Sequence, residues 1–302
     1  MPVPGIHFEE DEEDEHTADD ALTPLQLAAW EGDLATVSRL LQQGVDPNET
    51  PHGWYGKTSL QAAALRGHVG IVDLLLEAGA EVDAPGGNNG GRAALALAAG
   101  AGKSAVIERL LIAGADMNLP PHRYMGRSPL QAAAEFGNVG IVKTLIEGGA
   151  ELEGPMAQHF GRTPLQAAAE NAHVDAVEFF LGHGASVNTP PSRYKGVTAL
   201  QGAAACGNVD LVHRLVEAGA DVNALGSYYQ GGAALWLAAS AGHAEVVEML
   251  LNAGADQSAV SGNQGKQCTA LQVANLKGRE DVVELLKVWQ KNGVTSIDHA
   301  PG

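Results

Sequence analysis

The stretch "GRTPLQAAAE", residues 161–170, decides how most of the chain folds. A near copy, "GRSPLQAAAE", occupies residues 126–135, and nine of the ten letters agree at a separation of 35 residues. In both copies a Thr or Ser that can cap a helix precedes a Pro at the first helical position, where the missing N–H group costs little. The Ala-rich remainder permits close approach of neighbouring backbones. The stretch therefore predicts a short helix that recurs along the chain.

The same pattern fills most of the sequence. A Leu in phase with the one in "TPLQ" recurs in six steps of 35 residues and one of 36, at Leu25, Leu60, Leu95, Leu130, Leu165, Leu200, Leu235 and Leu271. Each copy continues into a second segment with helical spacing of apolar residues, such as "VGIVDLLLEAGA" at 69–80. One helix pair cannot bury its apolar side alone, but stacked neighbours can, so the repeats predict an all-α solenoid. We expect a disordered acidic tail over residues 1–20, a repeat domain over 21–290 and a C-terminal tail over 291–302.

These repeats resemble the ankyrin-repeat family. The resemblance is carried by "TPLQLAA" at 23, "SPLQAAA" at 128 and "TPLQAAA" at 163, with turns of the type "GH" or "GN" and endings of the type "LLxxGAxxN" after such stretches. It implies eight stacked repeats, each a helix–turn–helix with a β-hairpin finger, that together form a curved slab with a concave face. The period of about 35 exceeds the usual ankyrin period of about 33, so each finger gains two residues.

A Gln occupies the position where the family usually has His. This Gln stands after the repeat Leu at Gln26, Gln61, Gln131, Gln166, Gln201 and Gln272, and the two exceptions are Ala96 and Trp236. In this respect the chain resembles fungal ankyrin arrays. Because Gln has both a donor and an acceptor, we predict that it bonds the finger backbone to the helix and has no catalytic role.

The charge of the chain limits the kinds of partner that it can bind. Half of the net charge of −18 comes from nine acids within residues 9–20, a segment without Lys or Arg. Nonspecific binding to a nucleic-acid backbone is therefore not expected. The sequence has no run of about 20 apolar residues and no signal-peptide pattern at its start, and two Cys residues make no disulfide framework. These features predict a cytoplasmic or nuclear protein that does not enter a membrane.

The resemblance also implies where a partner binds, namely at the finger tips and at the exposed end of each first helix. Relative to the repeat Leu, these sites are the positions −6, −5, −3, +5 and +6. They hold many aromatic and charged residues, and we select as candidate partner-binding residues Trp54, Tyr55, Arg92, Tyr124, Arg127, Glu135, Phe136, Phe160, Arg162, Glu170, Tyr194, Tyr229 and Trp236. The same positions hold Trp30, Lys57 and Arg66 in the first two repeats.

Position −3 carries four successive cations, which are unusual in an acidic protein. They are Lys57, Arg92, Arg127 and Arg162. Stacked at about 10 Å, the three Arg side chains would form a ridge suited to carboxylates or other anions. The alternative is that Arg127 and Arg162 form ion pairs with Glu135 and Glu170 in their own repeats, which would contribute little if exposed.

Repeats three and seven differ from the others in the same way. Both lack the Gln, and both carry small residues at +5 and +6: Gly100 and Ala101 in repeat three, Ser240 and Ala241 in repeat seven. We expect the small residues to leave room in the groove, with Trp236 as the floor of the second gap.

These patterns favour a scaffold that recognises a protein or peptide in its concave groove. The alternative is a small-molecule-binding protein or an unusual enzyme that needs no cofactor, in which Glu135, Glu170 and His159 would supply acid/base chemistry to a small organic substrate. No metal-ligand spacing, phosphate-binding loop or Ser nucleophile elbow is present, so we expect no cofactor and no metal. A further hypothesis is that the acidic residues 9–20 fold back on the Arg residues at position −3 and compete with a ligand.

Overall fold

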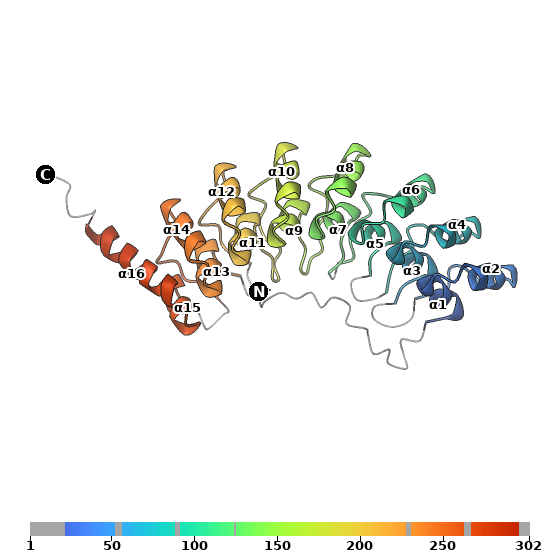
Figure 1. Cartoon of the computed structure of the whole chain (residues 1–302), viewed down its shortest axis with the longest axis horizontal. Helices are drawn as coiled ribbons and strands as arrows, with labels where there is room; N and C mark the ends of the chain where they lie inside the picture. Colours follow the sequence, from blue (N-terminus) through green and yellow to red (C-terminus); the bar gives the residue numbers. More distant parts are fainter. Residues whose placement is uncertain are drawn as a thin grey trace. The chain divides into compact units, whose positions relative to one another are not determined.

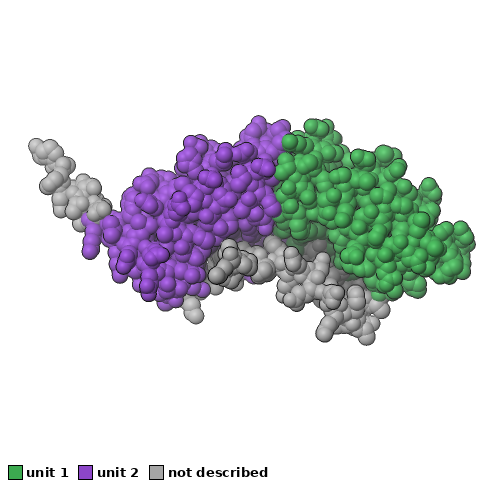
Figure 2. Space-filling model, in the orientation of Figure 1, with its two compact units in different colours: residues 1–157 green, residues 158–302 purple. Residues whose placement is uncertain are grey.

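The structure is a computed structural model that describes residues 22–51, 56–87, 91–123, 125–227, 231–262 and 267–295. The chain divides into two compact units, unit 1 over residues 1–157 and unit 2 over residues 158–302 (Figure 2). The acidic tail predicted for residues 1–20 lies outside the described residues.

Each unit contains helices in tandem pairs (Figure 1). Unit 1 contains α1 (Pro24–Glu31), α2 (Leu34–Gln42), α3 (Ser59–Arg66), α4 (Val69–Glu77), α5 (Ala94–Gly100), α6 (Ser104–Ile112), α7 (Pro129–Glu135) and α8 (Val139–Glu147). Unit 2 contains α9 (Pro164–Glu170), α10 (Val174–Gly182), α11 (Ala199–Cys206), α12 (Val209–Glu217), α13 (Ala234–Ala241), α14 (Ala244–Asn252), α15 (Ala270–Leu276) and α16 (Glu280–Thr295). Because α16 ends at Thr295, helix continues past residue 290, where we placed the end of the repeat domain.

The first helix of most repeats begins at a capping box. In α3 the Thr58 hydroxyl accepts from the Gln61 N–H group, and the Gln61 side chain accepts from the Thr58 N–H group. These bonds satisfy two of the N–H groups that a helix start leaves without partners. The same box opens α1, α7, α9, α11 and α15. The helix starts predicted from Thr, Ser and Gln are thus confirmed.

The predicted structural role of Gln is also confirmed. The side-chain oxygen of Gln61 is used in the capping box, and its amide nitrogen donates to the Ala84 carbonyl of the following finger at 2.8 Å. Equivalent bonds join Gln131 to Pro155 and Gln201 to Ala224. The three Gln side chains are almost completely buried, so each needs these partners to avoid a large desolvation penalty.

The core lies between successive repeats and is made of small and branched residues. Within unit 1, α1 packs on α3, α3 on α5 and α5 on α7, and within unit 2 the first helices α9, α11, α13 and α15 pack in the same order. The repeat Leu and the Ala residues after it are buried, as in Leu130 and Ala132. The predicted all-α solenoid is confirmed.

The fingers differ from the β-hairpins that we expected. Among the described residues there is no strand, and only two isolated bridges occur, His159 with Tyr194 and Ser261 with Cys268. The sequence of the fingers gives a physical reason. Pairs such as Pro120–Pro121 and Pro190–Pro191 have no N–H groups to donate to a strand ladder.

In four repeats, an Asn after the second helix joins the repeat to the next one. The Asn48 side chain donates to the Gly79 carbonyl at 2.9 Å and accepts from the Glu81 N–H group at 2.8 Å. The same pair of bonds is made by Asn118, Asn188 and Asn223. At the corresponding position, Asp83 accepts from the Asp116 N–H group but has no hydrogen to donate. We call these contacts the Asn links.

Candidate recognition site

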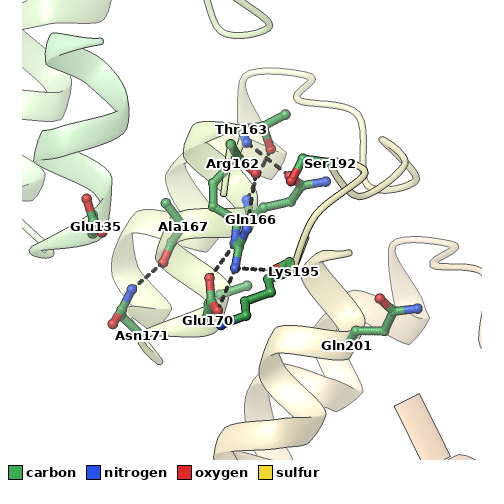
Figure 3. A network of polar contacts seen from close by, with 12 residues as sticks. Glu135, Arg162, Thr163, Gln166, Ala167, Glu170, Asn171, Ser192, Lys195 and Gln201 are labelled. Carbon is green, nitrogen blue, oxygen red and sulfur yellow. Dashed lines mark hydrogen bonds and ion pairs between the residues drawn. The ribbon is translucent and has the colours of Figure 1, made fainter. Parts of the chain in front are cut away.

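The two arginines of the repeated stretch lie in buried ion pairs. In unit 2 the Arg162 guanidinium donates through Nε and Nη2 to the two carboxylate oxygens of Glu170, and the Nη2–Oε1 distance is 2.9 Å (Figure 3). It also donates to the carbonyls of Gly161 and Lys195. The side chains of Arg162 and Glu170 are only 4% and 9% exposed.

Unit 1 contains the equivalent pair with one addition. Arg127 Nε donates to Glu135 Oε2 at 3.1 Å, and Nη1 donates to the carbonyls of Met125 and Gly126. A second guanidinium, that of Arg92 from the preceding repeat, lies 3.4 Å from the same Glu135 oxygen. Arg127 and Glu135 are 2% and 7% exposed, and Arg92 is 23% exposed.

The ion-pair interpretation is therefore confirmed, but these pairs are buried instead of exposed. Because Arg127 and Arg162 point inward onto Glu135 and Glu170, the structure does not contain the ridge of accessible guanidinium groups that the spacing predicts. A buried pair is costly to break, since removing one partner leaves the other charged and without compensation. Direct binding of a partner by these four residues stays a prediction.

The finger tips of unit 2 form a surface of aromatic rings and cations. The rings of His159 and Tyr194 stack with centroids 4.4 Å apart, and the Phe160 N–H group donates to the Tyr194 carbonyl. Lys195 Nζ lies 5.2 Å from the centre of the Phe160 ring, and Arg193 Cζ lies 5.9 Å from that of Tyr194. We call these five residues the finger surface. Arg193 and Lys195 are exposed, and the three rings are half-buried.

The backbone at the finger tips is left-handed at residues that are not glycine. The φ angles of Met125, Phe160 and Lys195, which are spaced by 35 residues, are 54°, 58° and 53°. A side chain in this region costs roughly 1 kcal/mol that glycine would avoid. The chain nevertheless keeps side chains at these tips, which is typical of strain retained at functional sites.

Phe136 follows α7 and is 56% exposed. A Cβ atom placed on Gly100 would come within 3.2 Å of the Phe136 ring, so the ring lies directly against the small residue of repeat three. The room predicted beside Gly100 is therefore partly filled by Phe136. The exposed remainder of the ring is available for contact with a partner.

Trp236 of repeat seven is half-buried and lies against Gly232, where a Cβ atom would approach the indole ring to 2.7 Å. Its indole nitrogen is buried and has no hydrogen-bond partner in the described part of the chain. Repeat seven lacks the Gln that would cap its first helix, and the Ala233 N–H group instead donates to the Ser261 hydroxyl.

A cluster in the first repeats was not among our candidates. Lys57 Nζ lies 5.6 Å and Arg66 Cζ 5.0 Å from the ring centre of Trp30, and the alkyl chain of Lys103 covers Gly67, the residue after Arg66. We call Trp30, Lys57, Arg66 and Lys103 the Trp30 cluster. In the part of the chain that the structure describes, none of its cations forms an ion pair with a carboxylate. The signal in the sequence was a Trp at +5 of repeat one with basic residues at −3 and +6 of repeat two.

Four candidates, Trp54, Tyr55, Tyr124 and Tyr229, lie outside the described residues.

The three residues considered for acid/base chemistry are divided between the units. Glu135 belongs to unit 1, and Glu170 and His159 belong to unit 2. Both carboxylate oxygens of Glu170 accept hydrogen bonds from Arg162, and this contact favours the ionised form of the carboxylate. Within the described ranges no group of three or more His, Cys, Asp or Glu residues could hold a metal ion. Burial raises the pKa of the Cys206 thiol, which reduces the fraction of reactive thiolate.

The repeated helix pairs, their capping boxes and the Asn links define a repeat solenoid. The family model described as ankyrin repeats, which spans three copies, matches residues 6–86, 85–156, 152–225 and 226–296. The chain belongs to the ankyrin-repeat family. This fold is a general scaffold for protein interactions.

One solved structure supports this assignment. The ankyrin repeat domain of human ASB11 is 30% identical to the chain, with a TM-score of 0.60, and the alignment covers 78% of this chain and 99% of that domain. No curated protein sequence matches the chain. Among the described residues, no helix combines the length and the apolar character that are needed to cross a membrane.

Proposed function

We propose that the chain binds a protein partner through its finger tips and the exposed ends of its first helices. The observation that carries this proposal is the finger surface, where the cations Arg193 and Lys195 lie over the rings of Tyr194 and Phe160. Aromatic residues and Arg are the usual anchors of protein interfaces, because they combine a large apolar area with directional hydrogen bonds.

The chemistry of the finger surface favours an extended segment that carries both acidic and apolar side chains. Carboxylates of the partner would pair with Arg193 and Lys195, and an apolar side chain would pack on the half-buried rings. In unit 1, the exposed part of Phe136 at the end of α7 offers an apolar contact of its own to a partner. Arg162, paired with Glu170, would support this surface by fixing the finger backbone at Gly161 and Lys195. In unit 1, Arg127 and Glu135, together with Arg92, would fix the finger of their own unit in the same way.

The test uses the left-handed backbone of the tips. Replacing Phe160 and Lys195 by Gly removes both side chains and also relieves the backbone strain, so the fold is preserved. We expect proteins captured from native lysate by the wild-type chain to be lost with Phe160→Gly/Lys195→Gly, and the purified partner to bind at least tenfold more weakly.

The matched control is Arg214→Gln, which changes a cation on the second helix α12, away from the finger tips. Each captured protein should bind this variant as it binds the wild type. If every captured protein also binds Phe160→Gly/Lys195→Gly unchanged, the finger surface is not the recognition site.

The small-molecule or enzymatic alternative stays a prediction for Glu135, Glu170 and His159. Native mass spectrometry of protein purified without denaturation separates the two functions. A retained compound that is lost in Glu170→Gln would favour the alternative over protein recognition.

A further inference from the structure

The Trp30 cluster has the composition of a binding site for carboxylates. The faces of aromatic rings attract cations, so Lys57 and Arg66 are held near the Trp30 ring, but this contact leaves their N–H groups free to donate. Glu31, which follows Trp30 and is exposed, makes no ion pair with either of them in the described part of the chain. In a chain with a net charge of −18, a group of cations that pairs with no carboxylate among the described residues is a distinct local feature.

The cluster also has an apolar border. Leu27 lies one helical turn before Trp30 on α1 and is 44% exposed, since α1 is the first helix of the array. A ligand on the cluster would meet the donors of Lys57 and Arg66 and the remaining face of the indole. Leu27, at the position that in other repeats faces the preceding repeat, adds an apolar side chain next to Trp30 on the outer side of α1. Such a surface suits an acidic peptide that also has apolar residues.

The chain itself contains a segment of this chemistry next to the cluster. Residues 9–20 hold nine acids and no Lys or Arg, and Ile6 and Phe8 precede them. The segment ends three residues before Thr23, the N-cap of α1. From this cap to Trp30 the helix rises about 11 Å, whereas twelve extended residues span about 40 Å. The acidic segment can therefore reach the cluster with length to spare.

We propose that the Trp30 cluster binds acidic peptide segments and that its occupant is residues 9–20 of the same chain. This proposal modifies the hypothesis that the segment folds onto the Arg residues at position −3, because Arg127 and Arg162 are buried and already paired. A covalently attached segment acts at an effective concentration in the millimolar range, so weak contacts suffice for occupancy. An acidic partner would have to displace it, and salt would weaken its hold.

The experiment measures binding of a labelled synthetic peptide with the sequence of residues 6–20 by fluorescence anisotropy. The receptor is the full chain with the nine acids of residues 9–20 changed to Gln or Asn, which leaves the cluster open. We expect this neutralised chain to bind the peptide at low salt, and to bind it at least tenfold more weakly at 0.5 M salt than at 0.05 M. The wild-type chain should bind at least tenfold more weakly than the neutralised chain, because its own segment competes.

Matched variants in the neutralised chain locate the site. Lys57→Gln/Arg66→Gln should abolish binding, whereas Arg109→Gln/Lys143→Gln, which removes two cations from the second helices α6 and α8, should leave the affinity within a factor of two. Circular dichroism confirms that each variant is folded. The Phe160→Gly/Lys195→Gly variant should bind the peptide normally, so failure of the finger surface and failure of this proposal are distinguishable.

Three results would overturn the proposal. The first is that the neutralised chain does not bind the peptide, and the second is that Lys57→Gln/Arg66→Gln binds as well as its parent. The third is equal affinity of the wild-type and neutralised chains for the peptide, which would mean that the attached segment does not occupy the site.

Sedimentation velocity tests whether the segment binds its own chain or a second copy. A wild-type dimer that dissociates on neutralisation would assign the segment to a second copy of the chain instead.

Discussion

Lys57 of repeat two occupies the same position as Arg127 and Arg162 of repeats four and five, yet the surroundings of these cations differ. Arg127 and Arg162 meet a Glu at +5 of their own repeat and are buried with it. Lys57, at the same position in repeat two, meets Leu65 in its own repeat and Trp30 in the preceding one. A Glu at +5 of the same repeat, or of the next repeat as for Arg92, thus pairs the cation, whereas Lys57 has Leu65 and Gly100 at these two positions.

This comparison predicts a graded series of effects on stability, which follows the burial and pairing of each cation. The largest effect is expected for Arg162→Ala. It leaves the Glu170 carboxylate, 9% exposed, without its guanidinium, and such losses typically cost about 3–5 kcal/mol of unfolding free energy. Urea denaturation followed by circular dichroism measures the change. The double variant Arg162→Ala/Glu170→Ala should recover part of the loss, and a cost below about 1 kcal/mol for Arg162→Ala would show that the pair does not stabilise the fold.

Arg92→Ala should have an intermediate effect. Arg92 is 23% exposed and contacts Glu135 through one nitrogen at 3.4 Å, and Glu135 keeps its bonds to Arg127 after the substitution. We expect a loss of about 1 kcal/mol in the same denaturation experiment. In the Arg127→Ala background the loss should be larger, because Arg92 and Arg127 are the two guanidinium groups that pair with Glu135 among the described ion pairs. Equal losses in both backgrounds would mean that the two arginines act independently.

Arg214→Ala tests an exposed pair in the same way. Arg214 and Glu178 are 2.6 Å apart but 49% and 44% exposed, so water screens their attraction. The expected loss is at most about 0.5 kcal/mol. A loss as large as that of Arg92→Ala would contradict the assignment of the series to burial.

The smallest effect on stability is expected for Lys57→Gln/Arg66→Gln. Neither cation has a carboxylate partner in the described residues, and the substitution should change the unfolding free energy by no more than about 0.5 kcal/mol. The same variant should nevertheless abolish binding of the acidic peptide. If the variant lost stability but still bound the peptide, Lys57 and Arg66 would stabilise the fold, as Arg127 and Arg162 do, and would not bind the ligand.

The sequence predicted the helices in detail because six of the eight repeats carry their own helix-start signal. Thr58 and Gln61 predicted a cap and a bond to the finger, and both are present. The fingers were predicted less well. Pro pairs in two of the fingers, at 120–121 and 190–191, remove donors of a strand ladder, and no hairpin strand forms among the described residues. Local signals thus specified the helices, whereas the fingers depend on contacts between residues far apart in the chain.

The candidate site was predicted only in part. Spacing identified the positions that hold Phe160 and Tyr194, which the structure brings together with Lys195. Spacing did not predict that the Arg162 side chain points toward Glu170. This contact joins a finger residue to the end of a helix, so it follows no helical periodicity. Trp30 was overlooked because its significance depends on the cations of the next repeat.

The Asn links have a consequence for the order in which the array opens. Asn48 joins repeat one to repeat two by donating one hydrogen bond and accepting another. Asp83 joins repeat two to repeat three only by accepting from the Asp116 N–H group, because its carboxylate has no hydrogen to donate to the Gly114 carbonyl. The first two repeats should therefore detach together from the end of unit 1. Their amide protons should exchange with solvent as one group and faster than those of α5 to α8, a difference that Asp83→Asn should narrow.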